Sequence, residues 1–457
     1  MKKYSLGFWI IFWGTSAVLL TFWYLYLNIG RVGVFPIVEN FMKVLPLETS
    51  QENEYKGLAA VSDFFLKKDG KEKKFLVLFL NNMEIRPGGG FIGAFGIVKI
   101  KNGKVVSMET HDLSNFDAKI PNALYAPYPI EQILKTKYWK MRDSNFSPDF
   151  EVNAKKAEEF YRMTDSEAEK FDGVIGITAN VLVSILKVTG PIEIEGYPGT
   201  YDASNAIMAL EYQVEKAFEQ QGIERGERKL IMSDLAIEIE KRVFALSLAE
   251  KIKLAKILLA DLNHKDVQLN FEDDKLQKSI EDAKWAGKVD AAWNDDFLMI
   301  NDANLGSFKS DYYVKRSIEY VVDLSGDVPY ANLKISYDHT AKEKDWMTRD
   351  YVDYLRVYVP ANSELVSQQN FDDAHHGAEF EKKYFGSIVR VPIGTSKAVE
   401  MSYKLPEFVR KDYNLKIQKQ AGLNDIPVTF RLLRQDGSQE SISKIMNEDM
   451  IFFDKSL

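Results

Sequence analysis

The sequence predicts an α/β fold, layered α/β/α around a mixed sheet, followed by an all-β immunoglobulin-like sandwich, with one N-terminal transmembrane helix. Three observations predict this arrangement. Residues 8–27 carry no charge. From residue 74 to about 300, short apolar runs alternate with amphipathic helical patterns, as in layered α/β proteins. From about residue 310, seven segments alternate with period two and no convincing helix interrupts them.

The N-terminal segment comes first. About twenty residues at 1.5 Å rise span roughly 30 Å, the thickness of the hydrocarbon core. Lys2 and Lys3 precede it, so the positive-inside rule places the N-terminus in the cytoplasm and the chain after Arg31 outside. A cleaved signal peptide is the alternative, but it would have a shorter apolar region and a small-x-small cleavage site. We expect a single-pass protein of the cell membrane, with the lipid bilayer as a partner.

Composition limits the function further. A chain of 457 residues is too long for one ordinary core. We expect a cytoplasmic tip and anchor at 1–30, a helical stalk or packing helix at 31–72, an extracytoplasmic α/β domain at 73–305 and a β-sandwich at 306–457. A formal net charge of -8 argues against a nucleic-acid partner. The absence of cysteine excludes disulfides and Cys-based metal sites. The oligomeric state does not follow from the sequence.

Within the α/β domain, residues 75–80 form a continuous apolar run typical of a buried central strand. Residues 91–100 predict a second strand. Asn102-Gly103 then predicts a type I′ hairpin, so the strand that follows should pair antiparallel. Further along, Ser247 and Glu250 form a capping-box pattern at the start of an amphipathic helix.

The stretch between the first two strands, "NNMEIRPGGG", contains Asn81, Asn82, Glu84 and Arg86 before three glycines. It matches G-x-G-x-x-G literally, but strand-like residues follow where a dinucleotide site requires a helix. Two interpretations stay open. The guanidinium and backbone N–H groups could bind an anion. Alternatively, the glycines meet a steric demand while Arg86 pairs with Glu84 or another carboxylate.

Two further polar groups are candidates. Arg142, Asp143 and Asn145 lie just before a helical pattern and form either a site or a buried network. Arg225 and Arg228 are three residues apart where one predicted helix ends and the next begins. Such a pair could hold a pyrophosphate, although salt bridges to neighbouring glutamates are an alternative.

Several segments, among them "NNMEIRPGGGFIG", "RDSNFSPDF" and "NDANLGSFKSDYYVKR", resemble the bacterial family of unknown function numbered 4012, from about residue 72 nearly to the C-terminus. A more distant resemblance is to the LytR-CpsA-Psr family of membrane-anchored phosphotransferases, which move glycopolymers from polyprenyl pyrophosphate to the cell wall. That resemblance rests on "FLVLFLNNMEIR", "FDGVIGITANVLVSILKVTGPIEIEG" and "ALEYQVEKAFEQQGIERGERKLI".

The distant resemblance implies a site. Arg86 would be a pyrophosphate ligand, and Arg225 and Arg228 fall on the two loop arginines of that family, so that Arg86 and Arg228 would be catalytic. No residue clearly matches the aspartates that hold Mg²⁺ in that family, and Asp143 is the best substitute as a catalytic residue and metal ligand. The polar clusters themselves add Asn81, Asn82, Glu84, Arg142 and Asn145 as candidate substrate ligands. The sequence also departs from that family, because Val214 and Lys216 stand where it has two arginines and Lys229 where it has Gln.

Two functions therefore remain. The first is a Mg²⁺-dependent phosphotransferase-like enzyme acting on polyprenyl-pyrophosphate-linked glycans in cell-wall assembly. The second is a non-catalytic surface module that binds wall glycan, such as peptidoglycan, or an envelope protein. Convergence of the three arginines on one pocket would favour the enzyme, and separate salt bridges would favour the binding module.

Overall fold

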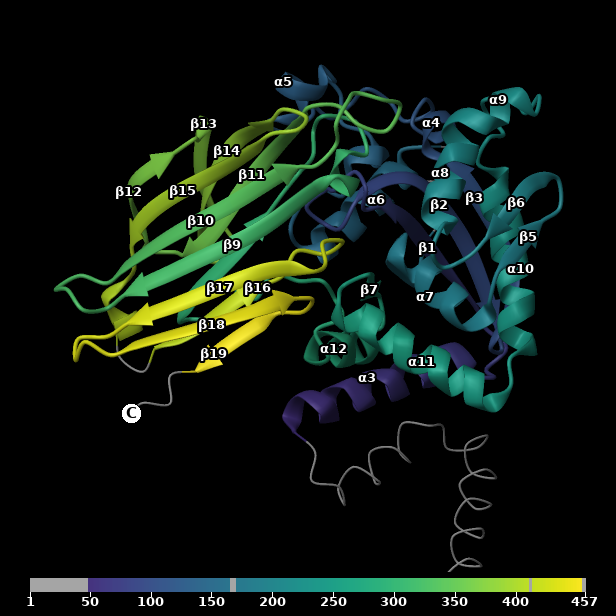
Figure 1. The fold of residues 1–457 in the computed structure, drawn as a ribbon. Coiled ribbons are helices and arrows are strands. Elements are labelled where there is room, and N and C mark those ends of the chain that lie inside the picture. Colours follow the sequence, from purple (N-terminus) through teal and green to yellow (C-terminus); the bar gives the residue numbers. More distant parts are fainter. Residues whose placement is uncertain (1–47, 165–169, 411–412, 454–457) are drawn as a thin grey trace, which may run out of the picture.

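The computed structural model describes residues 48–164, 170–410 and 413–453. The predicted anchor at residues 8–27 lies outside these ranges. Within them, no helix combines the length and the apolar character that a membrane crossing needs. The described chain forms an α/β region and a β region that lie side by side (Figure 1).

The α/β region is built on a mixed five-stranded sheet. Its strands, in spatial order, are β3 (Lys104–Asp112), β2 (Phe91–Lys101), β1 (Glu72–Asn81), β4 (Gly173–Thr178) and β7 (Val267–Phe271). The predicted apolar run is β1, the central strand, antiparallel to β2 and parallel to β4. The hairpin prediction is confirmed, since β2 and β3 pair antiparallel across Asn102 and Gly103, both with positive φ.

Helices cover both faces of this sheet because the side chains of β1 alternate between two cores. Leu76 and Leu78 pack on one face with Phe150 of α6 (Phe150–Arg162). Phe75 packs on the other face, beside α3 (Thr49–Leu66) and α12 (Asp274–Asp282). The predicted α/β/α layering is therefore present.

The first described helix, α3, lies in the range predicted as a stalk or packing helix, and it packs against the α/β region. Gly57 shows how close this packing is, because a Cβ there would lie 2.7 Å from the Trp285 ring. Leu58, Val61 and Phe64 also join the apolar cluster on this face of the sheet. Of the two alternatives for this range, a stalk or a packing helix, α3 is a packing helix, since its apolar side chains are buried by the sheet.

The remaining helices lie around the sheet and along one side of it. They are α4 (Leu113–Phe116), α5 (Ile130–Leu134), α7 (Asn180–Thr189), α8 (Ala206–Tyr212), α9 (Phe218–Gln220), α10 (Leu230–Ala245) and α11 (Leu248–Asn263). Shorter elements are the hairpin of β5 (Ile192–Ile194) and β6 (Tyr197–Tyr201), and the single turns Met141–Asp143, Gln213–Ala217, Ser310–Tyr312 and Glu407–Arg410. The capping box of Ser247 and Glu250 is confirmed at the start of α11.

The β region contains two six-stranded mixed sheets. One has the order β12 (Glu364–Gln369), β15 (Ser396–Lys404), β10 (Tyr330–His339), β9 (Val314–Asp323), β17 (Ile426–Leu433), β18 (Gln439–Met446). The other has the order β13 (Asp372–Glu379), β14 (Lys382–Val391), β11 (Tyr351–Pro360), β8 (Asp296–Asn301), β16 (Asn414–Gln418), β19 (Met450–Phe453). One apolar cluster draws on both sheets, so they share a core.

This arrangement corrects the predicted seven-stranded immunoglobulin-like sandwich. The seven predicted strands are present, but each sheet also contains a parallel pair, β8 with β16 and β9 with β17. Most of the missed strands, β12, β13, β18 and β19, are the four sheet edges. Strands β12 and β13 carry mostly exposed polar side chains, so they lack the apolar alternation that reveals inner strands. Strand β19 is apolar but only four residues long.

The missed inner strand is β8, which falls inside the predicted α/β range of 73–305. It pairs with β11 and β16, so it belongs to the β region. Phe297 and Leu298 of this strand are fully buried. A short apolar run of this kind does not show by itself which sheet it joins.

Candidate functional site

The loop that connects β1 to β2 is where the two regions meet. Ile85 is fully buried among apolar side chains of the β region. Its carbonyl accepts a hydrogen bond from the N–H of Asn304 at 3.0 Å. Gln420 donates to the carbonyl of Arg86 at 3.1 Å. The predicted motif is therefore an inserted loop between two regions of the molecule.

The glycines of this loop meet a steric demand. Gly89 has a φ of +117°, and a Cβ on Gly88 would overlap the Asn145 side chain at 2.0 Å. On the opposite side, a Cβ on Gly422 would lie 2.1 Å from the carbonyl oxygen of Gly89. Asn145, a predicted substrate ligand, donates to the carbonyl of Gly90 at 2.8 Å and is fully buried. Asn145 therefore holds the backbone of the β1–β2 loop in place.

Arg86 lies inside this interface, with 1% of its side chain exposed. Its guanidinium pairs with Glu84 at 3.0 Å and lies 3.6 Å from Asp143. It also donates to the carbonyl oxygen of Asn304. Burial raises the pKa values of both carboxyl groups, and the Arg86 charge works against that rise. One cation already faces two carboxylates, which leaves no free positive charge for an anionic ligand.

Asp143 was predicted as a magnesium ligand. Magnesium prefers several oxygen ligands in octahedral geometry. Among the described residues, no three His, Cys, Asp or Glu side chains lie close enough to hold a metal ion. The charged side chain nearest to Asp143 in the ion-pair network is Arg86. The residues around Asp143 therefore do not fit Mg²⁺.

Arg142, the neighbouring candidate, points to a different partner. Its Nε donates to Asp117 at 2.5 Å, and 37% of its side chain is exposed. Asp117 also accepts from the N–H of Met141 at 3.1 Å. This pair fixes the turn at Met141–Asp143.

The loop arginines do not join Arg86. Arg228 pairs with Glu215 at 3.0 Å and lies 3.8 Å from Asp112. Lys229, which stands where the resembled family has Gln, pairs with Asp112 at 3.1 Å and donates to the carbonyl of Gly93. Arg225 is exposed and makes no ion pair with any part of the chain that the structure describes. The three arginines thus lie in three different environments.

Asn81 connects the loop to this second group of charges. Its side-chain amide donates to Glu211 at 2.8 Å. Lys309 lies 3.4 Å from Glu211 and 3.5 Å from Glu215. Burial lowers the pKa of Lys309, but the two glutamates outweigh burial and raise it. This cation is likewise matched by carboxylates.

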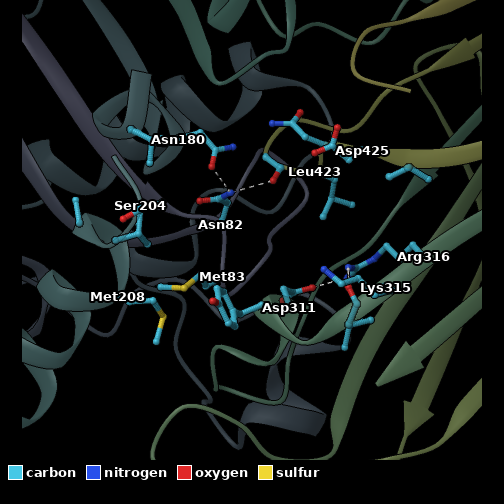
Figure 2. Close-up of a pocket in the computed structure, with 18 of the residues that line it drawn as sticks. Asn82, Met83, Asn180, Ser204, Met208, Asp311, Lys315, Arg316, Leu423 and Asp425 are labelled. Carbon is cyan, nitrogen blue, oxygen red and sulfur yellow. Dashed lines mark hydrogen bonds and ion pairs between the residues drawn. The ribbon is translucent and has the colours of Figure 1, made fainter. Parts of the chain in front are cut away.

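A cavity of about 490 Å³ opens beside the loop, between the α/β and β regions (Figure 2). Its polar lining comes from five separate parts of the chain: Asn82 after β1, Asn180 at the start of α7, Ser204 before α8, Asp311, Tyr312, Lys315 and Arg316 around the start of β9, and Asn424 and Asp425 before β17. Apolar side chains complete the wall: Met83, Val183, Ile207, Met208, Val314, Leu423, Ile426 and Pro427.

Two amide oxygens in this lining have no donor. Asn82 donates to Asn180 at 3.3 Å and to the carbonyl of Gly422 at 3.2 Å, while its own Oδ1 is buried without a partner among the described residues. Asn424 donates to Asp266 at 3.1 Å, and its Oδ1 is likewise buried without a partner among the described residues. Buried polar atoms without a partner are few in folded proteins. Arg86 Nε, Asp143 Oδ1 and Asn145 Oδ1 are also without one among the described residues, but Asn82 and Asn424 belong to the lining of the cavity.

One cation of the cavity lining, Arg316, is already paired. Arg316 donates to Asp302 at 2.6 Å, to Asp311 and to the Tyr351 hydroxyl at 2.7 Å. Lys315, which also lines the cavity, is exposed and makes no ion pair with the residues that the structure describes. The cavity therefore offers mainly amide and apolar groups, together with one cation that is unpaired within the described chain.

Sequence reasoning identified Asn82 but missed Asn180 and Asn424. No motif connects them, since Asn82 and Asn424 are brought together only by the packing of the β region on the α/β region. Neither amide stands in a pattern that distinguishes it from a helix-start or loop residue.

Comparison with known proteins bears on the α/β region. Residues 70–214 match the family described as "Protein of unknown function (DUF4012)". The first resemblance is thereby confirmed for this part of the chain. No curated protein matches the sequence.

Solved structures give only faint likenesses. The Lin1025 protein from Listeria innocua shares 14% identity over 48% of this chain and 79% of its own, with a TM-score of 0.28. TagV of B. subtilis shares 11% over 49% and 84%, with a TM-score of 0.26. A transcriptional regulator from Enterococcus faecalis shares 13% over 47% and 72%, also with a TM-score of 0.26. At TM-scores this low, none of the three carries an argument about activity.

Proposed function

We propose that this protein is a membrane-anchored, extracytoplasmic module of the cell envelope that binds a neutral, hydroxyl-rich ligand, a segment of wall glycan, without transforming it. One observation carries the proposal: the cavity between the two regions is lined by two amide residues, Asn82 and Asn424, whose side-chain oxygens lack donors among the described residues. Its size suits a small ligand or a short stretch of polymer.

The chemistry of the lining supports a sugar. Hydroxyl groups donate readily to amide oxygens such as those of Asn82 and Asn424. Tyr312 adds an aromatic ring, 49% exposed, to the lining, where the apolar face of a sugar can pack. A ligand with hydroxyl donors and an apolar face satisfies both features at once.

The alternative is a phosphotransferase-like enzyme that acts on polyprenyl-pyrophosphate-linked glycans. It would need cations that are free to meet a pyrophosphate. Arg86, Arg228 and Lys309 are each matched by two carboxylates within 4 Å. A pyrophosphate would have to break these pairs, and buried ion pairs are costly to break. The geometry therefore supports the binding module better.

Binding measurements decide between these two functions. The full chain in detergent is titrated calorimetrically with a peptidoglycan-derived disaccharide and, separately, with a short-chain polyprenyl pyrophosphate, with and without Mg²⁺. We expect disaccharide binding that weakens about two- to tenfold in Asn82→Ala and in Asn424→Ala, the worth of one hydrogen bond. Asn332→Ala is the matched control, because Asn332 is exposed on β10, away from the cavity.

Two results would contradict the proposal. If a folded wild-type protein shows no disaccharide binding, the cavity is not a glycan site. If it instead binds the pyrophosphate in a Mg²⁺-dependent manner, and Arg228→Ala abolishes that binding, the enzyme becomes the better explanation.

A further inference from the structure

The turn between α10 and α11 carries an unusual concentration of exposed apolar side chains. Leu248 and Phe244 are 76% and 66% exposed, the two highest values among the large apolar side chains of the described residues. Ile252, one turn after Leu248 on the same helix face, is 51% exposed. Ile237, two turns before Phe244, is 59% exposed. We call residues 237–256 the α10–α11 corner.

The corner is also basic, in a chain whose net charge is -8. Residues 237–256 contain five Lys or Arg residues and three Glu, a local charge of +2. Lys251, Lys253 and Lys256 are all exposed on α11. Glu238 pairs with Lys241 and Arg242, and Glu250 accepts from Ser247 in the capping box, so the basic character of the corner comes from the three lysines of α11. Exposed apolar side chains beside lysines are typical of helices that lie at the surface of an anionic membrane.

The position of the corner fits that surface. Helix α11 lies beside α3, and Asn263 donates to Glu54 at 3.2 Å across the two helices (Figure 1). Helix α3 begins at Thr49, where the described chain starts. Only about 20 residues, at most roughly 70 Å when extended, separate it from the predicted span that ends at residue 27. The corner, at the other end of α11, is about 24 Å from Asn263.

We propose that the α10–α11 corner lies on the anionic lipid surface of the membrane that holds the N-terminal anchor. Phe244, Leu248 and Ile252 enter the boundary between headgroups and acyl chains, and the lysines meet lipid phosphates. This second contact fixes the orientation of the interdomain cavity relative to the membrane, which a single attachment through the span does not. The inference depends on the predicted anchor but not on what the cavity binds.

The chain contains no cysteine, so one introduced cysteine can be labelled uniquely. The full chain is reconstituted into vesicles of zwitterionic lipid, or of the same lipid mixed with phosphatidylglycerol. An environment-sensitive fluorophore is attached to Leu248→Cys or, as a control, to Ile445→Cys, a 57% exposed position on β18. Quenching by lipids with brominated acyl chains is compared with quenching by aqueous iodide.

We expect the label at position 248 to lose most of its emission to brominated anionic vesicles, and to be protected from iodide. The label at position 445 should show the reverse. Changing Lys251, Lys253 and Lys256 together to Gln should return position 248 towards the behaviour of the control. Iodide quenching at 248 equal to that at 445 in both lipid mixtures would overturn the proposal. Protection from iodide without quenching by brominated lipid would also overturn it, and would show that protein covers the corner.

Discussion

Arg86 and Asn82 stand four residues apart on one loop, yet their surroundings differ in kind. The Arg86 side chain is closed in and meets two carboxylates and a backbone carbonyl. The Asn82 side chain faces a cavity and keeps an acceptor without a donor. The charged residue, which looks more like a site in the sequence, has its charge matched inside the protein, although its Nε has no acceptor among the described residues. The neutral residue lines a cavity, so access to a cavity is a better guide to function here than charge.

The strongest test of this comparison is Arg86→Met. Removing the guanidinium leaves Glu84 and Asp143 buried without their cation, which should cost about 3–5 kcal/mol of unfolding free energy. The control is Arg431→Met, whose half-exposed pair with Glu319 should contribute about 0–1 kcal/mol. Denaturant unfolding at neutral pH measures both. Equal losses in the two variants would show that the Arg86 cluster is not a structural unit.

A second test addresses the packing around the loop with two glycines of similar φ. Gly422 and Gly437 have φ values of +78° and +84°, so Ala is strained at both. A Cβ at 437 meets no atom within 4 Å, whereas one at 422 meets the Gly89 carbonyl oxygen at 2.1 Å. Gly437→Ala should cost about 1–2 kcal/mol, and Gly422→Ala about 1–3 kcal/mol more. Thermal unfolding of the two variants gives the difference, and no difference would mean that the loop is loosely held.

A third test measures how stability depends on pH, and it concerns Lys419, a buried lysine of the β region at the same interface. Burial lowers the pKa of Lys419 to about 7, although nearby Asp266 opposes the shift. Its amine donates to the carbonyls of His264 and Gln420. Between pH 7 and about 10.4 the unfolded chain binds a proton that the folded chain does not, so stability should rise with pH across this window.

Within this window Lys419 should add about 1.4 kcal/mol of unfolding free energy per pH unit. This slope should disappear as the pH falls through 7, because Lys419 is then protonated in both the folded and the unfolded chain. In Lys419→Met the rise in unfolding free energy between pH 7 and 9 should be smaller than in the wild type. Unfolding at both pH values measures the change. Identical slopes would show that Lys419 is charged in its buried position.

The smallest expected change in unfolding free energy is that of Asn82→Ala, a substitution in the lining of the cavity. Asn82→Ala removes hydrogen bonds to Asn180 and Gly422, and it also removes a buried oxygen that had no donor. The two consequences partly cancel, so the loss of unfolding free energy should stay within about 1 kcal/mol. A loss as large as that of Arg86→Met would mean that Asn82 is a structural residue and not a ligand-binding one.

Much of the fold was predictable because local sequence determines it. The continuous apolar run at residues 75–80 gave the central strand, and Asn102-Gly103 gave the hairpin. The alternating segments gave seven strands of the β region. Strands β12 and β13 at the sheet edges were missed because their exposed side chains carry no apolar alternation. The cap of Ser247 and Glu250 was found because a cap needs only residues close in sequence.

The sequence by itself determined the repeating elements, their caps and turns, and the polar residues available for chemistry. Tertiary structure decided what those residues do. Whether Arg86 is free or paired depends on Asp143 and on the carbonyl of Asn304, which reach it from other parts of the chain. Whether Asn82 lines a cavity depends on Asn424, more than 300 residues away. Contacts distant in sequence set the burial and the partners of each side chain. Those contacts decide that Arg86 is paired inside the protein and that Asn82 lines a cavity.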